Sequence, residues 1–431
     1  METVKLGIFG LGRGIGSFRA MLDCGGDIVA VCDKDERKLA EARTFIGNSL
    51  ATYTDFDAFI KHDGLQGVYL ANYFDEHTPF AIKALEHGVS VLSECTSNAT
   101  MAEGVALVRA AEKSTAFYML GENYQYMKFN LEMRRVYRSG KLGPCIFAEG
   151  EYNHPMEDFA KENEPGMKAL RPYGRHWRNR IPATYYITHS LAPLMYITGA
   201  VPRRVVGMTM HLPDTEDTPF RNLTGDRVGV MMTQNDDGSI FRVTGWARFG
   251  AHENSYRICG TKGQIENLRA GESTDSRESQ ISLRYNDWQV PEGERVASVY
   301  PADWEGDRVL KWKINRSGHG GADYLMMKDF IECIRDGRRP EVDVYFATAM
   351  ASVAILGHRS VLNGNVPYDV PDFHREEDRV KYENDHATPF YGRDGSKPTV
   401  NASSNPDYEA TEERLDAYDE AMKKIPDQLH Y

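Results

Sequence analysis

The chain has 431 residues, of which 41% are apolar and 26% are charged, values that are ordinary for a soluble globular protein. This length exceeds one core of ordinary size, so we expect two domains with extensions. The formal net charge of −12 argues against nucleic acid or an anionic membrane surface as the main partner.

The cysteine spacing and the hydropathy pattern exclude several further classes of protein. The six cysteines form no pair or cluster with metal-ligand spacing, so we expect reduced thiols and no metal site. No apolar run approaches the roughly 20 residues needed to span a bilayer. The N-terminus shows no export signal, and we therefore expect a cytoplasmic protein.

Residues 1–122 alternate short apolar strands with helices, which is typical of a parallel sheet with right-handed crossovers and helices on both faces. We predict a doubly wound Rossmann domain of the α/β class here. The predicted strands are 4–9, 27–33, 67–71 and 89–93, and the predicted helices are 17–23, 36–45, 77–87 and 101–113.

The pattern changes after residue 122, where we predict an α/β domain with an open, mostly antiparallel sheet over residues 123–371. Its predicted strands are 146–152, 204–210, 228–233, 240–249, 255–259 and 263–267, and its predicted helices are 130–139, 323–336 and 346–362. Residues 372–431 are polar, acidic and aromatic, with one predicted helix at 411–424. We interpret them as an extension that wraps the body or a neighbouring subunit.

A glycine-rich loop, Gly10-Leu11-Gly12-Arg13-Gly14-Ile15-Gly16, lies between the first strand and the first helix. Glycines there allow a tight turn and close approach of a pyrophosphate to free backbone N–H groups. The third glycine stands one residue later than the strict G-x-G-x-x-G spacing, and a purely structural turn is the alternative. We predict that Gly10, Gly12, Arg13, Gly14 and Ile15 bind a dinucleotide.

Asp33 ends the second predicted strand, about 20 residues beyond the loop, where a carboxylate accepts hydrogen bonds from the adenosine ribose. A carboxylate there repels a 2′-phosphate, so we expect NAD in preference to NADP, a preference that Lys34 weakens slightly. An ordinary turn residue is the alternative interpretation of Asp33.

The order of these features resembles the Gfo/Idh/MocA family of oxidoreductases over about residues 4–371. The resemblance is carried by residues 68–72 with His77, by 91–94, by 318–321 with Asp323, and by 343–345. It implies a Rossmann domain followed by a domain whose open sheet forms the substrate floor and often a homo-oligomer interface, here a dimer or tetramer. It also assigns four residues to the cofactor site, namely Asn72, His77, Glu94 and Asn123.

Two departures set the chain apart from the family's simple sugar dehydrogenases. Cys95 stands where the family has a lysine that hydrogen-bonds the reacting hydroxyl. Tyr185 stands where an aspartate precedes the active-site histidine by four residues. Of the lysine, aspartate and histidine of those dehydrogenases, this chain therefore keeps only the histidine, His189.

The segment Tyr186-Ile187-Thr188-His189-Ser190-Leu191-Ala192-Pro193 is similar to the Tyr-x-Thr-His-x-Leu-x-Pro segment of the NAD-dependent α-N-acetylgalactosaminidases. Further similar segments are His176-Trp177-Arg178, Glu122-Asn123 with Tyr126, and residues 149–154. The resemblance implies a carbohydrate substrate and a tightly bound NAD that is recycled in a redox-neutral reaction. It places Tyr186, His189 and Tyr152 at the sugar.

Hydride transfer from a carbinol needs a base at its oxygen, and we predict His189 for this role because imidazole titrates near neutrality. Tyr186, three residues earlier, would share one helical face with it. Oxidation at C3 of a sugar makes the C2 proton acidic, and we predict Tyr152 for that proton, with His154 and Tyr126 as helpers. The alternative for Tyr152 is an aromatic side chain that packs on the sheet.

Three more residues are predicted to contact the substrate. Trp177 and Arg178 belong to a basic, aromatic cluster that suits a sugar face and its hydroxyls, although a solvated loop is the alternative. His319 lies among glycines, where a contact to ligand and a structural turn are equally supported.

The residues leave two alternative functions open beside a redox-neutral glycoside hydrolase. One is a net NAD-dependent sugar or polyol dehydrogenase. The other is a non-catalytic sensor that binds NAD, which the retention of His189 with Tyr186 disfavours.

Overall fold

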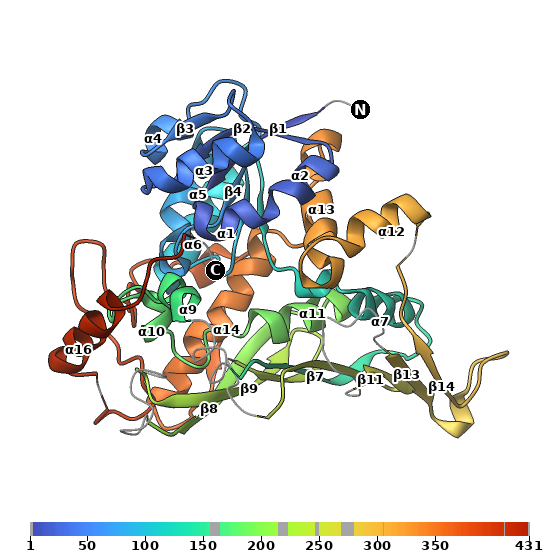
Figure 1. Cartoon of the computed structure of the whole chain (residues 1–431). Coiled ribbons are helices and arrows are strands. Elements are labelled where there is room, and N and C mark those ends of the chain that lie inside the picture. The colour runs from blue at the N-terminus through green and yellow to red at the C-terminus, as the bar shows by residue number, and fades with distance from the viewer. Residues whose placement is uncertain are drawn as a thin grey trace.

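The computed structural model describes residues 3–155, 164–213, 223–245, 250–268, 280–304, 306–408 and 410–429. The N-terminal domain is stacked above a large second sheet, and helices of the second domain fill the space between them (Figure 1). The helix α14 (Val344–Leu362) runs through this space and packs against both α6 (Met101–Lys113) and the strand β8 (Pro202–His211).

The N-terminal domain is built on a six-stranded sheet of order β3-β2-β1-β4-β5-β6 in which every pair is parallel. The predicted Rossmann fold is therefore confirmed. The strands are β1 Val4–Phe9, β2 Gly26–Cys32, β3 Ala51–Tyr53, β4 Gly67–Leu70, β5 Ser90–Ser93 and β6 Tyr118–Leu120, and the helices besides α6 are α1 Leu11–Gly14, α2 Phe18–Asp23, α3 Glu36–Ile46, α4 Phe56–Phe59 and α5 His77–Glu86.

The second domain is built on a nine-stranded sheet of order β14-β13-β12-β11-β7-β10-β9-β8-β15, in which only β10 and β7 pair in parallel. The predicted open, mostly antiparallel sheet is confirmed. Its strands besides β8 are β7 Cys145–Asn153, β9 Asp226–Asn235, β10 Ile240–Thr244, β11 Glu253–Gly260, β12 Gly263–Asn267, β13 Gln280–Tyr285, β14 Ala297–Pro301 and β15 Tyr368–Asp369. The strand predicted at 240–249 ends earlier, at Thr244, and residues 246–249 lie outside the described residues.

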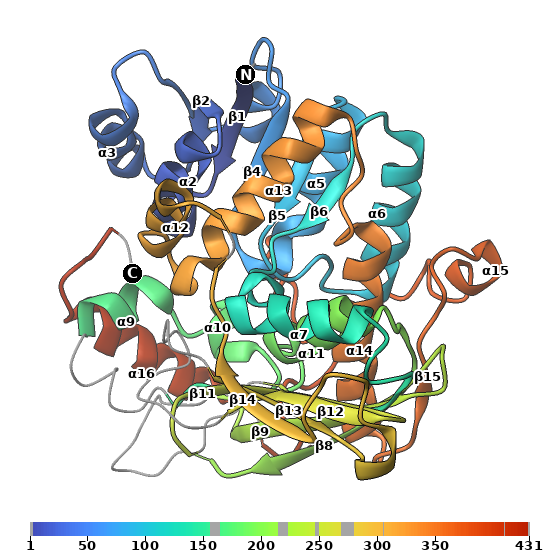
Figure 2. The ribbon, with the colours of Figure 1, turned by 90° about the vertical axis from the view of Figure 1, so that its right-hand side faces the viewer.

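The helices of the described residues cover one face of this sheet, and none of them lies over the other face, here called the open face (Figure 2). The covering helices include α7 (Lys128–Arg138), α11 (Thr188–Thr198) and α14, and α11 packs against both α7 and β7. The remaining helices of this region are α9 Glu164–Leu170, α10 Trp177–Arg180, α12 Arg308–Asn315 and α13 Ala322–Asp336. None of the helices in the described part of the chain is long and apolar enough to cross a membrane.

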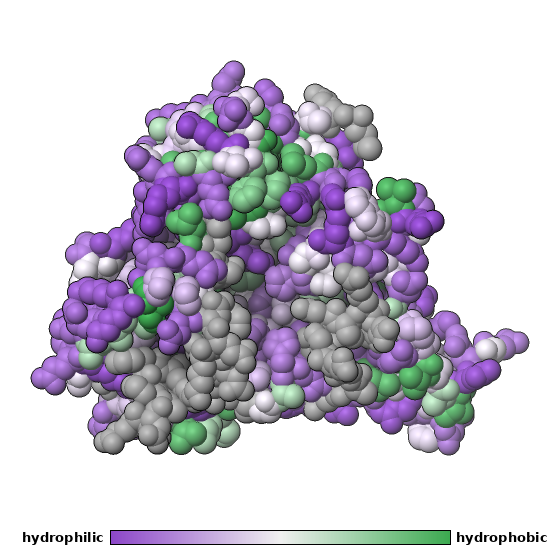
Figure 3. Space-filling view, viewed as in Figure 1, coloured by the Kyte–Doolittle hydropathy of each residue, from purple (hydrophilic) through white to green (hydrophobic). Residues whose placement is uncertain are grey.

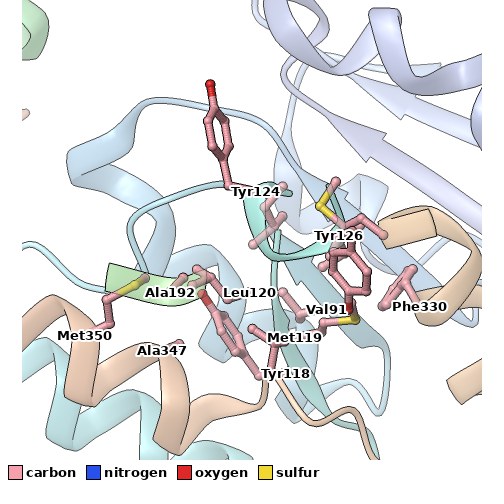
Figure 4. Packing of buried hydrophobic residues seen from close by; sticks show 14 of the residues in the cluster. Val91, Tyr118, Met119, Leu120, Tyr124, Tyr126, Ala192, Phe330, Ala347 and Met350 are labelled. Atoms are coloured by element: carbon pink, nitrogen blue, oxygen red, sulfur yellow. The ribbon is translucent and has the colours of Figure 1, made fainter. Parts of the chain in front are cut away.

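The hydrophobic core is continuous across the two domains (Figure 4). Met119 and Leu120 of β6 are fully buried, and so are Ala192 of α11 and Met350 of α14. Because strand β6 of the Rossmann sheet shares its core with helices of the second domain, the end of that strand is held in a fixed place beside α11.

The described residues of the C-terminal extension, 372–408 and 410–429, contact the body of their own chain. Its helices are α15 Glu376–Arg379 and α16 Glu412–Lys423. The backbone carbonyl of Asp385 accepts a hydrogen bond from Ala102 N at 2.9 Å, and that of Asn401 lies 2.7 Å from His358 Nε2.

Candidate active site

The glycine loop begins a short helix with the geometry that a dinucleotide needs. Gly10 has φ of 91°, and a Cβ atom there would lie 2.5 Å from the carbonyl oxygen of Ala71, so only glycine fits. A Cβ atom on Gly14 would lie 2.6 Å from Ile8 Cγ2, and this glycine therefore allows α1 to pack tightly on β1. Ile15 is buried beside it.

Asp33 stands at the carboxyl end of β2 and connects two loops of the cofactor site. Its carboxylate accepts hydrogen bonds from Leu11 N at 2.7 Å and from Asp35 N at 2.9 Å. It lines a cavity of about 1040 Å³ together with three of the predicted cofactor residues, Gly10, Gly12 and Arg13. This cavity, with its glycine cradle and its carboxylate, fits a dinucleotide.

Further predicted cofactor residues lie along the same edge of the sheet. Arg13 Nε lies 3.1 Å from Glu94 Oε1, and the same carboxylate accepts a hydrogen bond from the hydroxyl of Tyr69. His77 is buried, with Nδ1 2.7 Å from the carbonyl oxygen of Thr96. Its Nε2 lies 3.3 Å from the carbonyl oxygen of Asn72, so its ring connects the loops after β4 and β5.

Trp177 and Arg178, predicted for the substrate, line the same cavity as the glycine loop. The Trp177 ring stacks on Phe74 at 5.0 Å, and the Arg178 guanidinium lies 4.5 Å above the Trp177 ring. These two residues of the second domain therefore form part of the wall of the cofactor cavity.

The catalytic residues that we predicted come together around His189, at the start of α11. The ring of Tyr152 lies 4.7 Å from that of His189, and the ring of Tyr186 lies 5.2 Å from it. A third tyrosine, Tyr124, stacks on the imidazole at 4.0 Å. The face of the molecule seen in Figure 3 is hollowed between the two domains.

Tyr186 reaches this cluster by a different route from the one we predicted. The helix α11 begins at Thr188, so Tyr186 lies in the preceding loop and not one turn earlier on a shared helical face. The prediction of a helical face was wrong, because the segment 182–187 forms a turn before the helix starts. The two rings are nevertheless neighbours.

The partner of His189 is a carboxylate from the other domain. Glu122, fully buried after β6, lies with Oε1 2.8 Å from His189 Nδ1, and it accepts a hydrogen bond from Tyr124 N at 3.0 Å. Burial alone would raise the pKa of Glu122, but the adjacent imidazole and these hydrogen bonds lower it overall. The carboxylate therefore stays ionised and can orient and stabilise an imidazolium.

Cys95, which stands at the position of the family's lysine, donates a hydrogen bond from Sγ to Glu122 at 3.3 Å. Burial and the two neighbouring carboxylates, Glu122 and Glu94, raise the pKa of the Cys95 thiol well above its ordinary value. A neutral thiol is a poor nucleophile, so this residue serves as a hydrogen-bond donor.

Tyr152 and His154 lie on the sheet side of the site. Burial, followed by the neighbouring Tyr124 and Tyr186, raises the pKa of Tyr152 well above its ordinary value. Burial, and then the neighbouring His252, lower the pKa of His154 to about 4. At neutral pH both side chains are therefore uncharged.

His319 and Asn123 share one partner, the buried carboxylate of Asp323 at the start of α13. His319 Nδ1 lies 3.0 Å from that carboxylate, and Asn123 donates to it from Nδ2 at 2.6 Å. Burial would raise the pKa of Asp323, but the hydrogen bond and charge of His319 outweigh it and lower this pKa to about 2. The His319 ring lies 6.1 Å from that of Tyr124.

Tyr126, which we predicted for the substrate, lies apart from the cluster. Its ring points away from Tyr124 towards α13 (Figure 4), and its hydroxyl donates to Asp329 at 2.7 Å. In the short helical turn Tyr124–Tyr126, the side chain of Tyr124 therefore packs on His189, whereas that of Tyr126 lies in the core.

Sequence reasoning missed three residues of the site, of which Glu122 and Tyr124 are two. The third is Asn254, which stands directly opposite Tyr152 in the register of β11 and β7 and so shares its face of the sheet. Asn254 is 1% exposed, and neither its Oδ1 nor its Nδ2 has a hydrogen-bond partner among the described residues. No cluster of three or more metal-ligating side chains occurs in the described ranges.

Two family models match the chain, one in each domain. Residues 4–122 match the model described as the oxidoreductase family with an NAD-binding Rossmann fold, Gfo/Idh/MocA. Residues 252–379 match the model of the glycosyl hydrolase 109 C-terminal domain.

Relatives and solved structures agree with these matches. A glycosyl hydrolase family 109 protein of Saccharopolyspora erythraea is 27% identical over 429 residues, covering 92% of this chain and 87% of its own. Such a protein of Bacteroides fragilis is 27% identical over 416 residues, covering 87% and 86%. Levoglucosan dehydrogenase in complex with NADH and levoglucosan has a similar fold, with a TM-score of 0.67, 16% identity, and coverage of 86% of this chain and 100% of that chain.

The chain thus has the fold of the Gfo/Idh/MocA oxidoreductases, with a Rossmann domain that matches the NAD-binding family model and an open-sheet second domain. Within that fold, residues 252–379 match the glycosyl hydrolase 109 C-terminal domain, and curated relatives at 27% identity bear that family's name. The resemblance stated from the sequence is confirmed.

Proposed function

We propose that the chain is an NAD-dependent carbohydrate enzyme that works as a redox-neutral glycoside hydrolase. The observation that carries this proposal is the pair of His189 and the buried Glu122, enclosed by three tyrosines beside the loops of a dinucleotide cavity. The names of its relatives support the hydrolytic outcome.

The cofactor would be held by Gly10, Gly12, Arg13, Asp33 and Asn72, which line the cavity. When bound there, NAD supplies reversible storage of one hydride, which a redox-neutral reaction takes from a sugar carbon and later returns to it. We further propose that the NAD is retained between turnovers.

His189 would accept the proton of the C3 hydroxyl as that carbon is oxidised to a ketone, and it would return the proton when the carbon is reduced. Glu122 holds the imidazole by Nδ1, which leaves Nε2 to face the substrate and stabilises the positive charge that develops. Cys95 keeps the second oxygen of that carboxylate satisfied.

The C3 ketone acidifies the proton on C2, and we assign its removal and return to Tyr152. Loss of that proton forms the C1–C2 double bond as the bond from C1 to the leaving group breaks. Water then adds its oxygen to C1 and releases one proton, which balances the proton taken up by the departing alcohol, and Tyr152 returns its proton to C2. The net change is hydrolysis, with no electron gained or lost.

The proposed substrate wall combines Trp177, Arg178, His154 and His319 with Asn254. A buried amide atom without a hydrogen-bond partner lowers the stability of the fold by roughly 1–3 kcal/mol. Polar substituents of a sugar bound beside Tyr152 would form hydrogen bonds with the two amide atoms of Asn254. The hydroxyl of Tyr126 is engaged elsewhere, so we assign that residue to the core.

A net dehydrogenase is the second candidate function, and the similarity in fold to levoglucosan dehydrogenase favours it. An incubation of the protein with NAD and a panel of aryl glycosides in deuterated water separates the two functions. We expect glycoside cleavage with deuterium at C2 of the product and no net NADH. Steady accumulation of NADH from a free sugar, without cleavage of any glycoside, would contradict the hydrolase proposal.

We also propose that the chain forms a homo-oligomer through the open face of the second sheet. Large apolar side chains on that face are exposed, among them Met208 and Met210 of β8 and Met232 of β9. Met232 and Val206 are register partners, so these side chains form one patch across adjacent strands. A contiguous patch of this kind marks an interface.

A further inference from the structure

The outer wall of the dinucleotide cavity comes from the C-terminal extension of the same chain. The cavity of about 1040 Å³ is lined on one side by the glycine loop and Asp33, and on the other by Tyr391, Arg393 and Leu429. The match to the glycosyl hydrolase 109 C-terminal domain ends at residue 379, so this wall lies beyond the matched region.

We propose that the described residues of 390–429, here called the C-terminal latch, close the dinucleotide cavity and slow the release of NAD. The proposal rests on the proposed function in one respect, that NAD is the ligand of this cavity. It adds a function for a segment that the family model does not cover.

The first part of the latch contacts the Rossmann domain at the loop after β4. Phe390 packs against Phe74 with ring centroids 6.0 Å apart, and the guanidinium of Arg393 pairs with the carboxylate of Glu76. The guanidinium of Arg393 also lies 4.7 Å from the ring centroid of Phe80 on α5. This part is therefore held directly on the cofactor-binding domain.

The helix α16 of the latch contacts residues 171–175 of the second domain, in a segment that also lines the cavity. Asp419 accepts a hydrogen bond from Gly174 N at 2.6 Å, and the hydroxyl of Tyr418 donates to the carbonyl of Arg171 at 2.8 Å. Arg175 forms an ion pair with Glu412 of the same helix. Figure 1 shows α16 beside α9 and α10.

The end of the latch contacts both the second domain and the Rossmann domain. The Asp427 carboxylate lies 2.7 Å from Lys168 Nζ of α9 and 3.8 Å from a guanidinium nitrogen of Arg37 on α3. Asp427 is exposed, with 64% of its side chain accessible, so these ion pairs are individually weak. A closure made of several weak contacts can open and shut without unfolding the domain.

The experiment compares NAD release from the full chain and from the double variant Asp419→Ala/Asp427→Ala. Each protein is loaded with NAD, diluted, and the released NAD is measured with a coupling dehydrogenase. We expect release to be about fivefold faster in the double variant, because the anchor of α16 at Gly174 and the ion pairs of Asp427 with Lys168 and Arg37 are lost. The matched control is Glu420→Ala, which removes a carboxylate of α16 that pairs only with Lys423 among the described residues.

Equal release rates in the double variant and the wild type would overturn the latch. A second measurement needs no variant: hydrogen exchange of the α16 amides in the wild type is expected to slow when NAD is added, and unchanged exchange would also overturn the proposal. Rapid release from the wild type together with NAD-dependent protection of α16 would contradict NAD retention but not closure. A wild type that binds no NAD would overturn both.

Discussion

His189 has a carboxylate partner, Glu122, although Tyr185 stands where the family places an aspartate four residues before the histidine. Tyr185 occupies that position and packs in the core against Phe390 and His358, with ring centroids 5.8 and 5.9 Å away. The carboxylate for His189 comes instead from a residue 67 positions earlier in the sequence. The imidazole therefore keeps an anionic partner in spite of the substitution.

Replacing that carboxylate by an amide tests its role as a positioning group. In Glu122→Gln the imidazole loses its anionic partner, and we expect kcat to fall by at least about 100-fold, as when the carboxylate partner of a catalytic histidine becomes an amide. KM is expected to change little, because Glu122 is fully buried behind His189. Steady-state kinetics check this, and a change confined to KM would contradict it.

The raised pKa of Tyr152 gives its assignment a pH signature. Only the tyrosinate can remove the C2 proton, and its fraction rises about tenfold per pH unit below its pKa. We therefore expect C2 deuterium exchange to accelerate from about pH 7 to about pH 9, and to be lost in Tyr152→Phe. The control Tyr126→Phe should retain exchange, and a flat pH profile in the wild type would assign the proton to another group.

The sequence predicted the residues of the site better than the contacts between them. His189, Tyr186 and Tyr152 come together as predicted, because the two segments that carry them, 149–154 and 186–193, both resemble segments of one family. Glu122 lies in a segment that carries the resemblance, but the sequence contains no spacing pattern that predicts its contact with a histidine of the other domain. The missing aspartate at Tyr185 was the one available signal that a carboxylate had to come from elsewhere.

At the scale of the element, the turn from β1 into α1 depends on one glycine. In Gly10→Ala the new methyl group would meet the Ala71 carbonyl and force a positive φ on alanine, so we expect a loss of roughly 1–3 kcal/mol in the free energy of unfolding. NAD binding by calorimetry should weaken at least tenfold. The matched control is Gly16→Ala in the same loop, where a Cβ atom has no neighbour within 4 Å.

The first turn of α13 carries a pH-dependent contribution to stability. The pKa of Asp323 is lowered to about 2 in the folded chain, from an ordinary value of 3.8. When the pKa of a carboxyl is lower in the folded than in the unfolded chain, its ionised form stabilises the fold at pH values above the unfolded-state pKa. This contribution is lost as the pH falls through the folded-state pKa. We expect Asp323 to contribute about 2 kcal/mol at neutral pH, lost between about pH 4 and pH 2.

Denaturant titrations of Asp323→Asn and of the wild type across that range check this contribution. The difference between the two free energies of unfolding should shrink as the pH falls. A difference that stays constant with pH would show that the variant acts through lost packing and not through the charge.

Elements with strong local signals were predicted almost to the residue, and short ones were not. The helix α6 begins with a capping box between Thr100 and Glu103, and its predicted and observed bounds are both 101–113. Strands β3 and β6 have three residues each, too few to show a period of two. These two strands form because neighbouring strands supply their hydrogen bonds, and such pairing between distant segments cannot be predicted from the local sequence.

At the scale of the whole molecule, the open face of the second sheet predicts the assembly state. In Met208→Glu/Met232→Glu, two carboxylates would be buried in the proposed interface, and we expect the oligomer to dissociate to monomers in analytical ultracentrifugation. The control Leu22→Glu places a carboxylate at an exposed apolar residue of the Rossmann domain. A wild type that is already monomeric would contradict the proposed interface.

The His189–Glu122 pair is divided between the two domains, because Glu122 ends the segment that matches the Rossmann model and His189 belongs to the second domain. Since β6 shares its buried core with α11, the distance between the carboxylate and the imidazole is set by how the two domains pack on each other. A core substitution that shifts this packing, even one far from both side chains, would therefore disturb the pair.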